Sequence, residues 1–328
     1  MNDDAMQAHV TYFGKIPSRG DFVKATNSHQ LVSTLDQWLM QAMELMSVDP
    51  RWKMAYDAVR PLNFAFLGSN SRLAIAGHLV ASRDASQRRF PFLAASPLSV
   101  EQPLNFISRS PLVLSRLWTR LENLTRGVMA ERDSTSALQT LAGTVIPIEV
   151  SPAAYNANFL DFSEMQTVGE LEAMLQQSGH GVSVRRSIVA LGLLLAPVMT
   201  AGASRLEKGI KLSLPTDPLY RYLVATFWLD LIAPFLARGD FELATFIGVI
   251  GGVPSLVLGF NGTVARSLQS VFDPQVDAEQ NIRIDDAEWV EDHIGSDYGV
   301  KKLASYLEQP GLTLRQARDT FRETFIGA

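Results

Sequence analysis

Hydrophobic positions in the first third of the chain switch between strand spacing and helical spacing. Residues 10–16 are aromatic and β-branched, which is typical of a strand, and Pro17 and Gly20 then end it. Apolar residues recur at helical spacing from 31 to 46. The pattern next predicts three strands and a helix, at 61–67, 73–80, 90–95 and 112–129. Short turns between these strands favour an antiparallel sheet with helices packed on it.

The second half repeats this order of elements. The pattern predicts a helix, a strand, a helix, two strands and a helix, at 185–199, 209–214, 219–237, 243–250, 255–260 and 263–272. Gly251 and Gly252 mark the turn between the paired strands. We therefore predict an α+β fold, an α/β sandwich with mainly antiparallel sheets. The order is compatible with two related β-α-β-β-α units. Nothing in the sequence beyond the order of the elements supports such a duplication.

The middle of the chain is less regular. A strand is expected at 145–150 and a helix at 168–177. We predict an N-terminal α+β domain, 1–150, and a C-terminal α/β domain, 151–328, with the boundary somewhere within 130–181.

The C-terminal part has a different composition. Between 277 and 297, eight acidic residues stand against one basic residue, Arg283. Such a run is usually a solvated face, and the alternative is a docking surface for a basic partner. Residues 300–326 should form two helices, separated by Pro310 and Gly311.

Composition excludes several function classes. Of the 328 residues, 47% are hydrophobic, which is enough for a large core. The net charge of -5 argues against a nucleic-acid binder, which is usually basic. The absence of cysteine excludes disulfides, thiolate zinc sites and a cysteine nucleophile. The first ten residues lack the features of a secretory signal, so we expect a cytoplasmic protein.

Two apolar stretches raise the question of a membrane span. Residues 187–203 contain Pro197 and fall short of the roughly 20 apolar residues that a spanning helix needs. Residues 219–260 are interrupted by charged side chains such as Asp230. Both are interpreted as buried core, without direct membrane insertion.

No motif indicates catalysis or metal binding. The stretch GKIPSRGD lacks the spacing of a phosphate-binding P-loop, and no dinucleotide-binding glycine motif occurs. The five histidines are scattered without the spacing of paired ligands, and no serine nucleophile elbow is present. The prediction is therefore a protein that is not an enzyme and uses no metal and no cofactor.

The stretch YFGKIPSRGDFV, residues 12–23, concentrates polar and turn-forming side chains between aromatics. Its notable residues are Gly14, Lys15, Pro17, Arg19, Gly20, Asp21 and Phe22. Gly20 permits a backbone bend, and Phe22 can anchor the loop in the core. The letters RGDF return at 238–241 after a helix, so we interpret the repeat as coincidence. The stretch is either a well-packed turn between strand and helix or a loop that binds a partner.

A second cluster is SQRRFPF, residues 86–92. Arg88 and Arg89 precede Phe90 and Pro91, which begin a strand that looks buried. Arginine forks suit carboxylates and phosphate groups. The alternatives are an internal ion pair, with Asp21 or Asp84 as partner, or a ligand site.

These stretches together resemble the TagF family, also called ImpM, of type VI secretion-associated proteins. The opening stretch matches the first motif of the family. The helix that follows contains the family's tryptophan, Trp38, within LDQWL at 35–39. A third family segment is matched by SRDASQRRFPF at 82–92. Gln87 stands where the family pattern has glycine. We expect Trp38 to lie in the hydrophobic core rather than to contact a partner. The resemblance extends over residues 12–97.

The resemblance implies a post-translational repressor of type VI secretion. Its implied partners are the forkhead-associated scaffold protein of that apparatus and, in some systems, inner-membrane core components, which could recruit it to the inner membrane. The mechanism would be sequestration, with Lys15, Arg19, Asp21, Arg88 and Arg89 as the polar site that binds the partner. The family's occasional phosphatase domain is not recognisable here.

Two other functions stay open at this point. The first is a domain or enzyme that binds a small ligand, for instance a phosphate ester, through Arg19, Asp21, Arg88 and Arg89. The second is a subunit that stabilises the assembled apparatus.

Overall fold

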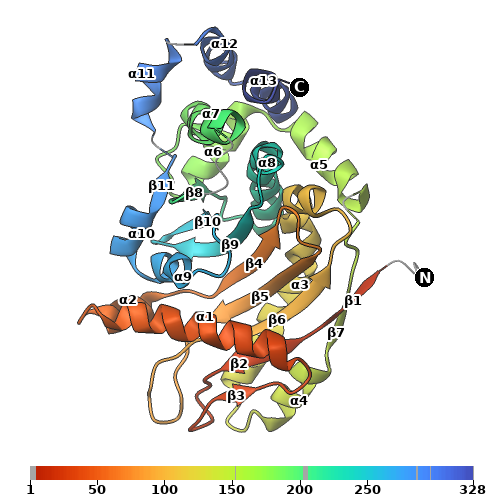
Figure 1. Ribbon diagram of the computed structural model, residues 1–328, viewed down its shortest axis with the longest axis vertical. Coiled ribbons are helices and arrows are strands. Elements are labelled where there is room, and N and C mark those ends of the chain that lie inside the picture. Colours follow the sequence, from red (N-terminus) through yellow and green to blue (C-terminus); the bar gives the residue numbers. More distant parts are fainter. Residues whose placement is uncertain (1–4, 152, 202–205, 286, 296, 328) are drawn as a thin grey trace.

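A nine-stranded sheet forms the centre of the molecule (Figure 1). The computed structural model describes residues 5–151, 153–201, 206–285, 287–295 and 297–327. In spatial order the strands are β11 (Asn281–Arg283), β8 (Gly209–Ser213), β10 (Val253–Gly259), β9 (Glu242–Ile250), β4 (Leu62–Gly68), β5 (Leu73–Val80), β6 (Phe92–Ser99), β2 (Thr11–Gly14) and β3 (Val23–Lys24). β11 runs parallel to β8, whereas the other pairs are antiparallel, as predicted.

A smaller sheet pairs β1 (Met6–His9) with β7 (Val145–Ile148). Its antiparallel register brings the first described residues of the chain against the strand that was predicted at 145–150.

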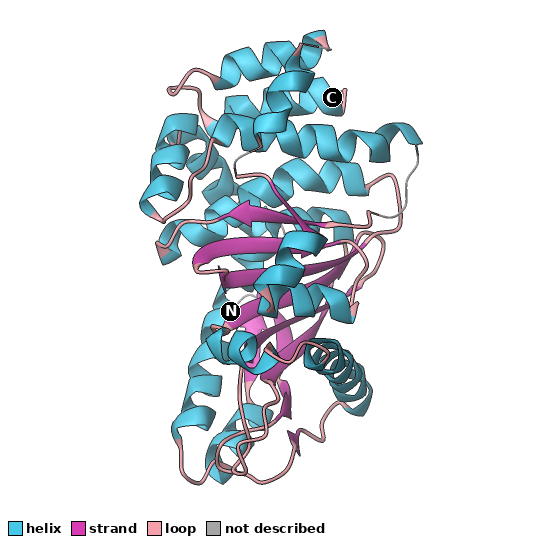
Figure 2. Cartoon of the chain, turned by 90° about the vertical axis from the view of Figure 1, so that its left-hand side faces the viewer, coloured by secondary structure: helices cyan, strands magenta, loops and turns pink. Residues whose placement is uncertain are grey.

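Helices cover both faces of the large sheet. One face carries α1 (His29–Ser47), α2 (Trp52–Ala58) and α9 (Ala265–Phe272). The other face carries α3 (Pro103–Ala130) and α8 (Pro218–Leu236). The remaining helices are α4 (Thr135–Gly143), α5 (Ala153–Met165), α6 (Val168–Gln177), α7 (Val184–Ala201), α10 (Pro274–Gln280), η1 (Glu288–Val290), α11 (Glu291–Ile294), α12 (Tyr298–Leu307) and α13 (Leu314–Phe325). Figure 2 shows several of them stacked beyond one edge of the sheet. The α+β prediction is confirmed.

The central strand β4 is buried along its whole length, because helices pack on both faces. Side chains alternate between the faces of a strand. Phe64 and Phe66 accordingly join the core beneath α1, whereas Ala65 and Leu67 join the core beneath α3 and α8. β4 also pairs with β9, which places Phe64 opposite Phe246.

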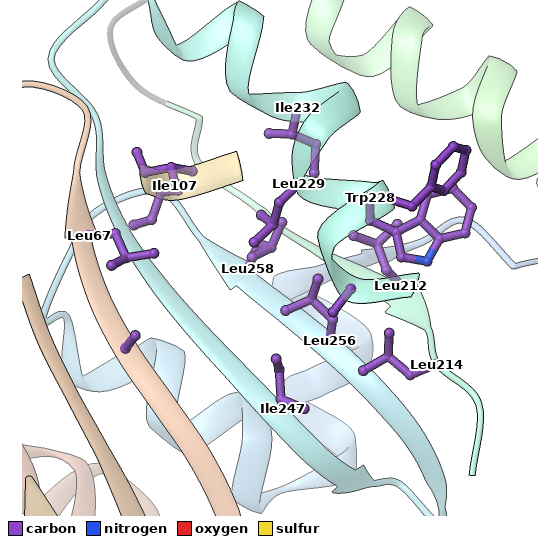
Figure 3. Close-up of a cluster of buried hydrophobic side chains, with 14 of the residues drawn as sticks. Leu67, Ile107, Leu212, Leu214, Trp228, Leu229, Ile232, Ile247, Leu256 and Leu258 are labelled. Atoms are coloured by element: carbon purple, nitrogen blue, oxygen red, sulfur yellow. The ribbon is translucent and has the colours of Figure 1, made fainter. Parts of the chain in front are cut away.

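Helix α8 is apolar nearly all round because it lies between the sheet and further helices. Trp228, Leu229 and Ile232 face leucines and isoleucines of β8, β9 and β10 (Figure 3). The indole Nε1 of Trp228 donates to the Ser213 carbonyl at 3.0 Å. In the described part of the chain, α8 alone has the length and composition of a possible membrane span, and most of it is buried inside the fold.

The predicted start of one helix was wrong. α3 begins at Pro103, well before the predicted residue 112, and Pro111 lies inside it. A proline inside a helix lacks the N–H that would bond the carbonyl four residues earlier. Here the Ser110 hydroxyl donates to that carbonyl, on Ile107, at 2.9 Å, so the helix continues. The short helix α2 was not predicted.

The acidic segment 277–297 is not simply a solvated face, so that expectation was wrong for part of it. Asp277 is buried, and Lys211 Nζ lies 2.5 Å from its carboxylate. Glu291 accepts from Arg185 at 2.6 Å and from Arg186 at 3.1 Å. These pairs fix the segment against α7 and β8. Asp286 lies outside the described residues.

The sheet joins the two halves of the chain, because β4 of the first half pairs with β9 of the second over seven residue pairs. The proposed boundary within 130–181 stays a prediction.

Candidate functional site

The two arginine-bearing stretches form adjacent loops. The RGDF loop, residues 15–22, leaves β2, and the arginine loop, residues 81–91, leads into β6. Since β2 and β6 pair with Gly14 opposite Phe92, both loops emerge at the same end of these strands (Figure 1). Backbone bonds connect them. Lys15 N–H donates to the Pro91 carbonyl at 3.3 Å, and Ala85 N–H donates to the Arg19 carbonyl at 2.8 Å.

Asp84 is the buried centre of this pair of loops, with no exposed surface. Its Oδ2 accepts from Lys15 Nζ at 2.9 Å and from Arg88 Nε at 2.6 Å. Its Oδ1 accepts from the backbone N–H groups of Ser86, at 2.9 Å, and Arg88, at 3.0 Å. Burial alone would raise the pKa of Asp84, but the bonds from Lys15 and Arg88 outweigh it and hold this pKa well below the ordinary range. The carboxylate therefore stays charged and fully bonded.

Three of the predicted site residues share the outer surface of the loops. The side chains of Arg19 and Arg88 are 44% and 60% exposed, and Asp21 is exposed too. Arg19 Nη2 donates to the Thr135 hydroxyl and to Asp133 at 3.3 Å. Arg88 Nη2 donates to the Gly20 carbonyl at 2.5 Å. The Asp21 carboxylate accepts from the N–H of its neighbour Phe22 at 2.8 Å.

Lys15 does not share that surface, because it is buried. Besides its bond to Asp84, its ammonium lies 4.8 Å from the ring centre of Phe22. Phe22 stacks on Phe13 and meets the edge of Phe90, with ring centres 5.5 and 4.9 Å apart. Phe22 is still 40% exposed. This residue therefore has one face in the core and one in solvent.

Arg89 points elsewhere and does not join Arg19 and Arg88. Its Nε donates to Asp57 of α2 at 2.8 Å, and a second nitrogen bonds the other carboxylate oxygen. This hydrogen bonding lowers the pKa of Asp57. Nearby, the buried Tyr56 hydroxyl donates to the Ser82 carbonyl and accepts from the Ser82 N–H, both at 2.9 Å. Tyr56 and Asp57 thus fix the arginine loop to α2. Only the helical spacing of Trp52 and Tyr56 could have indicated them.

Two backbone positions explain features of the motif. Gly14 has φ +136°, and a Cβ there would lie 2.1 Å from the Pro91 carbonyl oxygen, so only glycine fits. Gln87 has φ 65°, in the left-handed region that favours glycine, which agrees with the glycine of the family pattern at this position. Gly20 is different. Its φ is not left-handed and a Cβ there would meet no atom within 4 Å, so the bend predicted at Gly20 does not require glycine.

The other motif residues differ in their burial. Phe90 and Pro91 are buried, whereas Pro17 is exposed beside a cavity lined by His78 and Met129. Trp38 is buried as predicted, with its ring 4.9 Å from that of Phe66.

The second RGDF stretch occupies a different setting. Phe241 is fully buried, and the Gly239 carbonyl accepts from the Ser69 hydroxyl at 2.9 Å. The repeated letters therefore do not repeat an environment.

Within the described ranges, no group of three or more histidine, aspartate or glutamate side chains could hold a metal ion.

The two loops together form a rigid base with a charged, partly aromatic outer surface.

Residues 11–144 match the family model of the TagF N-terminal domain, described as type VI secretion system-associated. The resemblance to the TagF family is confirmed. The TagF-like region thus spans β2 to the residue before β7, and both loops lie inside it.

Among solved structures, the chain is similar to PA0076 from Pseudomonas aeruginosa PAO1. The identity is 26%, the match covers 42% of this chain and 64% of that chain, and the TM-score is 0.35. The chain thus covers less than two thirds of the length of PA0076. No curated protein matches the chain in sequence.

Proposed function

We propose that this protein is a non-enzymatic repressor of type VI secretion that acts by sequestering a component of the apparatus. One observation carries the proposal beyond the family match. The exposed side chains of Arg19, Asp21 and Arg88 sit on two loops held by the buried Asp84 network. Because the base of the loops is rigid, binding costs little conformational entropy.

The partner in this proposal is the forkhead-associated scaffold of the apparatus, with inner-membrane core components as further contacts, and the protein acts in the cytoplasm. The surface has the composition of an interface. Arginine and aromatic residues are enriched where proteins meet, and Phe22, which is 40% exposed, lies on the same loop as Arg19 and Asp21. Lys15 and Arg89 act in this proposal as supports of the loops.

The test in cells compares secretion by strains that carry different forms of the protein. Deletion is expected to increase the amount of apparatus-secreted protein in the culture supernatant. The wild type should restore repression, and the double variant Arg19→Ala/Asp21→Ala should not. Arg72→Ala is the matched control, because Arg72 is exposed and precedes β5, at the opposite end of that strand from the arginine loop.

Two outcomes would contradict the proposal. Loss of secretion on deletion would identify an assembly subunit instead of a repressor. Full repression by a double variant that is present at wild-type level and folded would remove the RGDF loop from the interface.

A further inference from the structure

A second charged cluster lies apart from both loops, in a cavity of about 540 Å³. Four helices contribute to its wall, namely α3, α5, α8 and α13. Its polar lining includes Gln102, Asn105, Ser108, Arg109, Asn156 and Arg322. The cavity has the volume of a small-molecule site.

The buried Asp230 of α8 lies at this cavity between two arginines. Its Oδ1 accepts from Arg109 Nη1 at 2.6 Å, and its Oδ2 accepts from Arg322 Nη2 at 2.8 Å. The side chain of Asp230 is only 3% exposed. Among the described residues, no other acidic side chain lines the cavity, so two guanidinium groups face one carboxylate and one positive charge is in excess. Arg318 comes within 4.0 Å of Asp230, but its own close partner is Asp319, at 2.7 Å.

The hydrogen-bonding capacity of these arginines is not used up. Arg322 Nε is buried and has no acceptor among the described residues. Such an unsatisfied donor is costly, and an acceptor in the adjoining cavity would relieve it after a small rotation of the side chain. Arg109 is held more firmly. Its Nε donates to Asn156 at 2.9 Å, and its guanidinium lies over the Phe159 ring, 4.2 Å from the centre.

The helices around the cavity add to its positive character. α3 begins here at Pro103, its N-cap residue Gln102 makes no capping side-chain bond, and its first turn has no acidic residue. α5 also begins here, again without an acidic residue in its first turn. The N-terminal end of a helix carries partial positive charge and unpaired N–H groups. Both ends therefore favour the same sign of ligand as the arginines.

We propose that this cavity binds a small phosphate-bearing molecule, with the phosphate at Arg322 and Arg109. The guanidinium fork of arginine matches phosphate oxygens, and the excess charge is neutralised by the bound anion. The cavity is larger than a phosphate ion. Its remaining wall offers amides and hydroxyls from Gln102, Asn105 and Ser108, which suit a polar organic part of about the size of a sugar. A ligand there would contact helices of both halves of the chain.

The test measures binding of inorganic phosphate by calorimetry and by thermal unfolding, with chloride at equal ionic strength as the reference. Phosphate should raise the melting temperature of the whole protein. Arg322→Gln should weaken phosphate binding by about ten- to a hundred-fold, as expected for the loss of a charge-assisted bond. Arg120→Gln is the control, because Arg120 is exposed on α3 and lies outside the cavity. Its affinity should equal that of the wild type.

Arg322→Lys provides a second variant if the glutamine variant does not fold. Lysine keeps a charge beside Asp230 but lacks the fork, so binding should still weaken. Absence of any phosphate effect beyond that of chloride, or equal affinity of folded Arg322→Lys or Arg322→Gln and wild type, would overturn the proposal. Glucose 6-phosphate should bind more tightly than phosphate. Equal affinity for the two would show that the polar wall plays no part.

Discussion

The two buried aspartates of this protein, Asp84 and Asp230, use similar partners to different effect. Each accepts bonds from two cationic side chains. Asp84 also accepts two backbone N–H groups, so its network is closed, and it fixes a surface above it. In the part of the chain that the structure describes, the Asp230 carboxylate has only arginine partners, and Arg322 retains a buried Nε donor without an acceptor beside a cavity. A closed network stabilises a surface for contact, whereas an open one leaves capacity for a ligand.

The largest expected effect separates the two aspartates directly. Asp84→Asn should lower the melting temperature by about 5–10 °C, because it leaves the buried Lys15 ammonium without its counter-charge. Asp230→Asn should lower it by less than half as much. The Arg322 side chain is 32% exposed and can turn to solvent, and Arg109 keeps Asn156. Calorimetric scans of both variants measure the difference. Equal losses would show that the two networks are energetically alike.

Stability should be far more sensitive to substitution at Gly14, where the RGDF loop leaves β2, than at Gly20, at the tip of the loop. Gly14→Ala should lower the free energy of unfolding by about 3 kcal/mol, since the new Cβ meets the Pro91 carbonyl and φ is unfavourable. Gly20→Ala is the matched control and should change it by less than about 0.5 kcal/mol, because nothing lies near the added methyl. Urea unfolding gives both values. A large loss at Gly20 would contradict the open tip.

A pH series distinguishes Asp84 from His78, a buried histidine near the loops. Burial, followed by the charge of Arg126, lowers the pKa of His78 from 6.5 to about 4. Its neutral form therefore contributes stability above pH 6.5 that is lost as the pH falls towards 4, to the extent of about 3 kcal/mol. The pKa of Asp84 is lowered from 3.8, so its contribution is lost only below that pH. Unfolding free energies at pH 7, 5 and 4 should fall in the wild type and much less in His78→Gln. A parallel fall in both proteins would assign the effect to other groups.

The smallest expected effect concerns the strained turn of the arginine loop. Gln87→Gly should raise the free energy of unfolding by up to about 1 kcal/mol, because glycine adopts a left-handed φ without the steric cost that glutamine incurs. Arg83 would lose its 3.1 Å bond to the Gln87 side chain, which is exposed and contributes little. Destabilisation by more than about 0.5 kcal/mol would mean that this side chain, rather than the turn, matters.

The sequence allowed most of the sheet and helices to be predicted, because strands such as β4 and helices such as α1 are regular runs. The start of α3 was missed. Pro111 lies inside this helix, where the Ser110 hydroxyl bonds the Ile107 carbonyl that the proline leaves without an N–H partner. The RGDF loop could be recognised in the sequence because the residues of its motif are contiguous. Asp84 was foreseen as one of two partners for Arg88, four residues away.

Long-range pairs were beyond the sequence pattern. Lys15 lies 69 residues from Asp84, and nothing in local spacing connects them. The cavity at Asp230 was still harder to predict from the sequence, because Arg109 and Arg322 lie 121 and 92 residues from Asp230 along the chain. Along the chain, Asp230 was visible only as a charge that interrupts an apolar run. Tertiary packing alone brings these residues together.

The central claim, that the exposed tip of the RGDF loop binds the forkhead-associated scaffold, is tested most directly by the affinity between the two purified proteins. Biolayer interferometry should give binding by wild type and by Arg72→Ala, and a dissociation constant at least about tenfold higher for Arg19→Ala/Asp21→Ala. The melting temperature of each variant should match that of the wild type. Equal affinity of the stable double variant and the wild type would contradict the account.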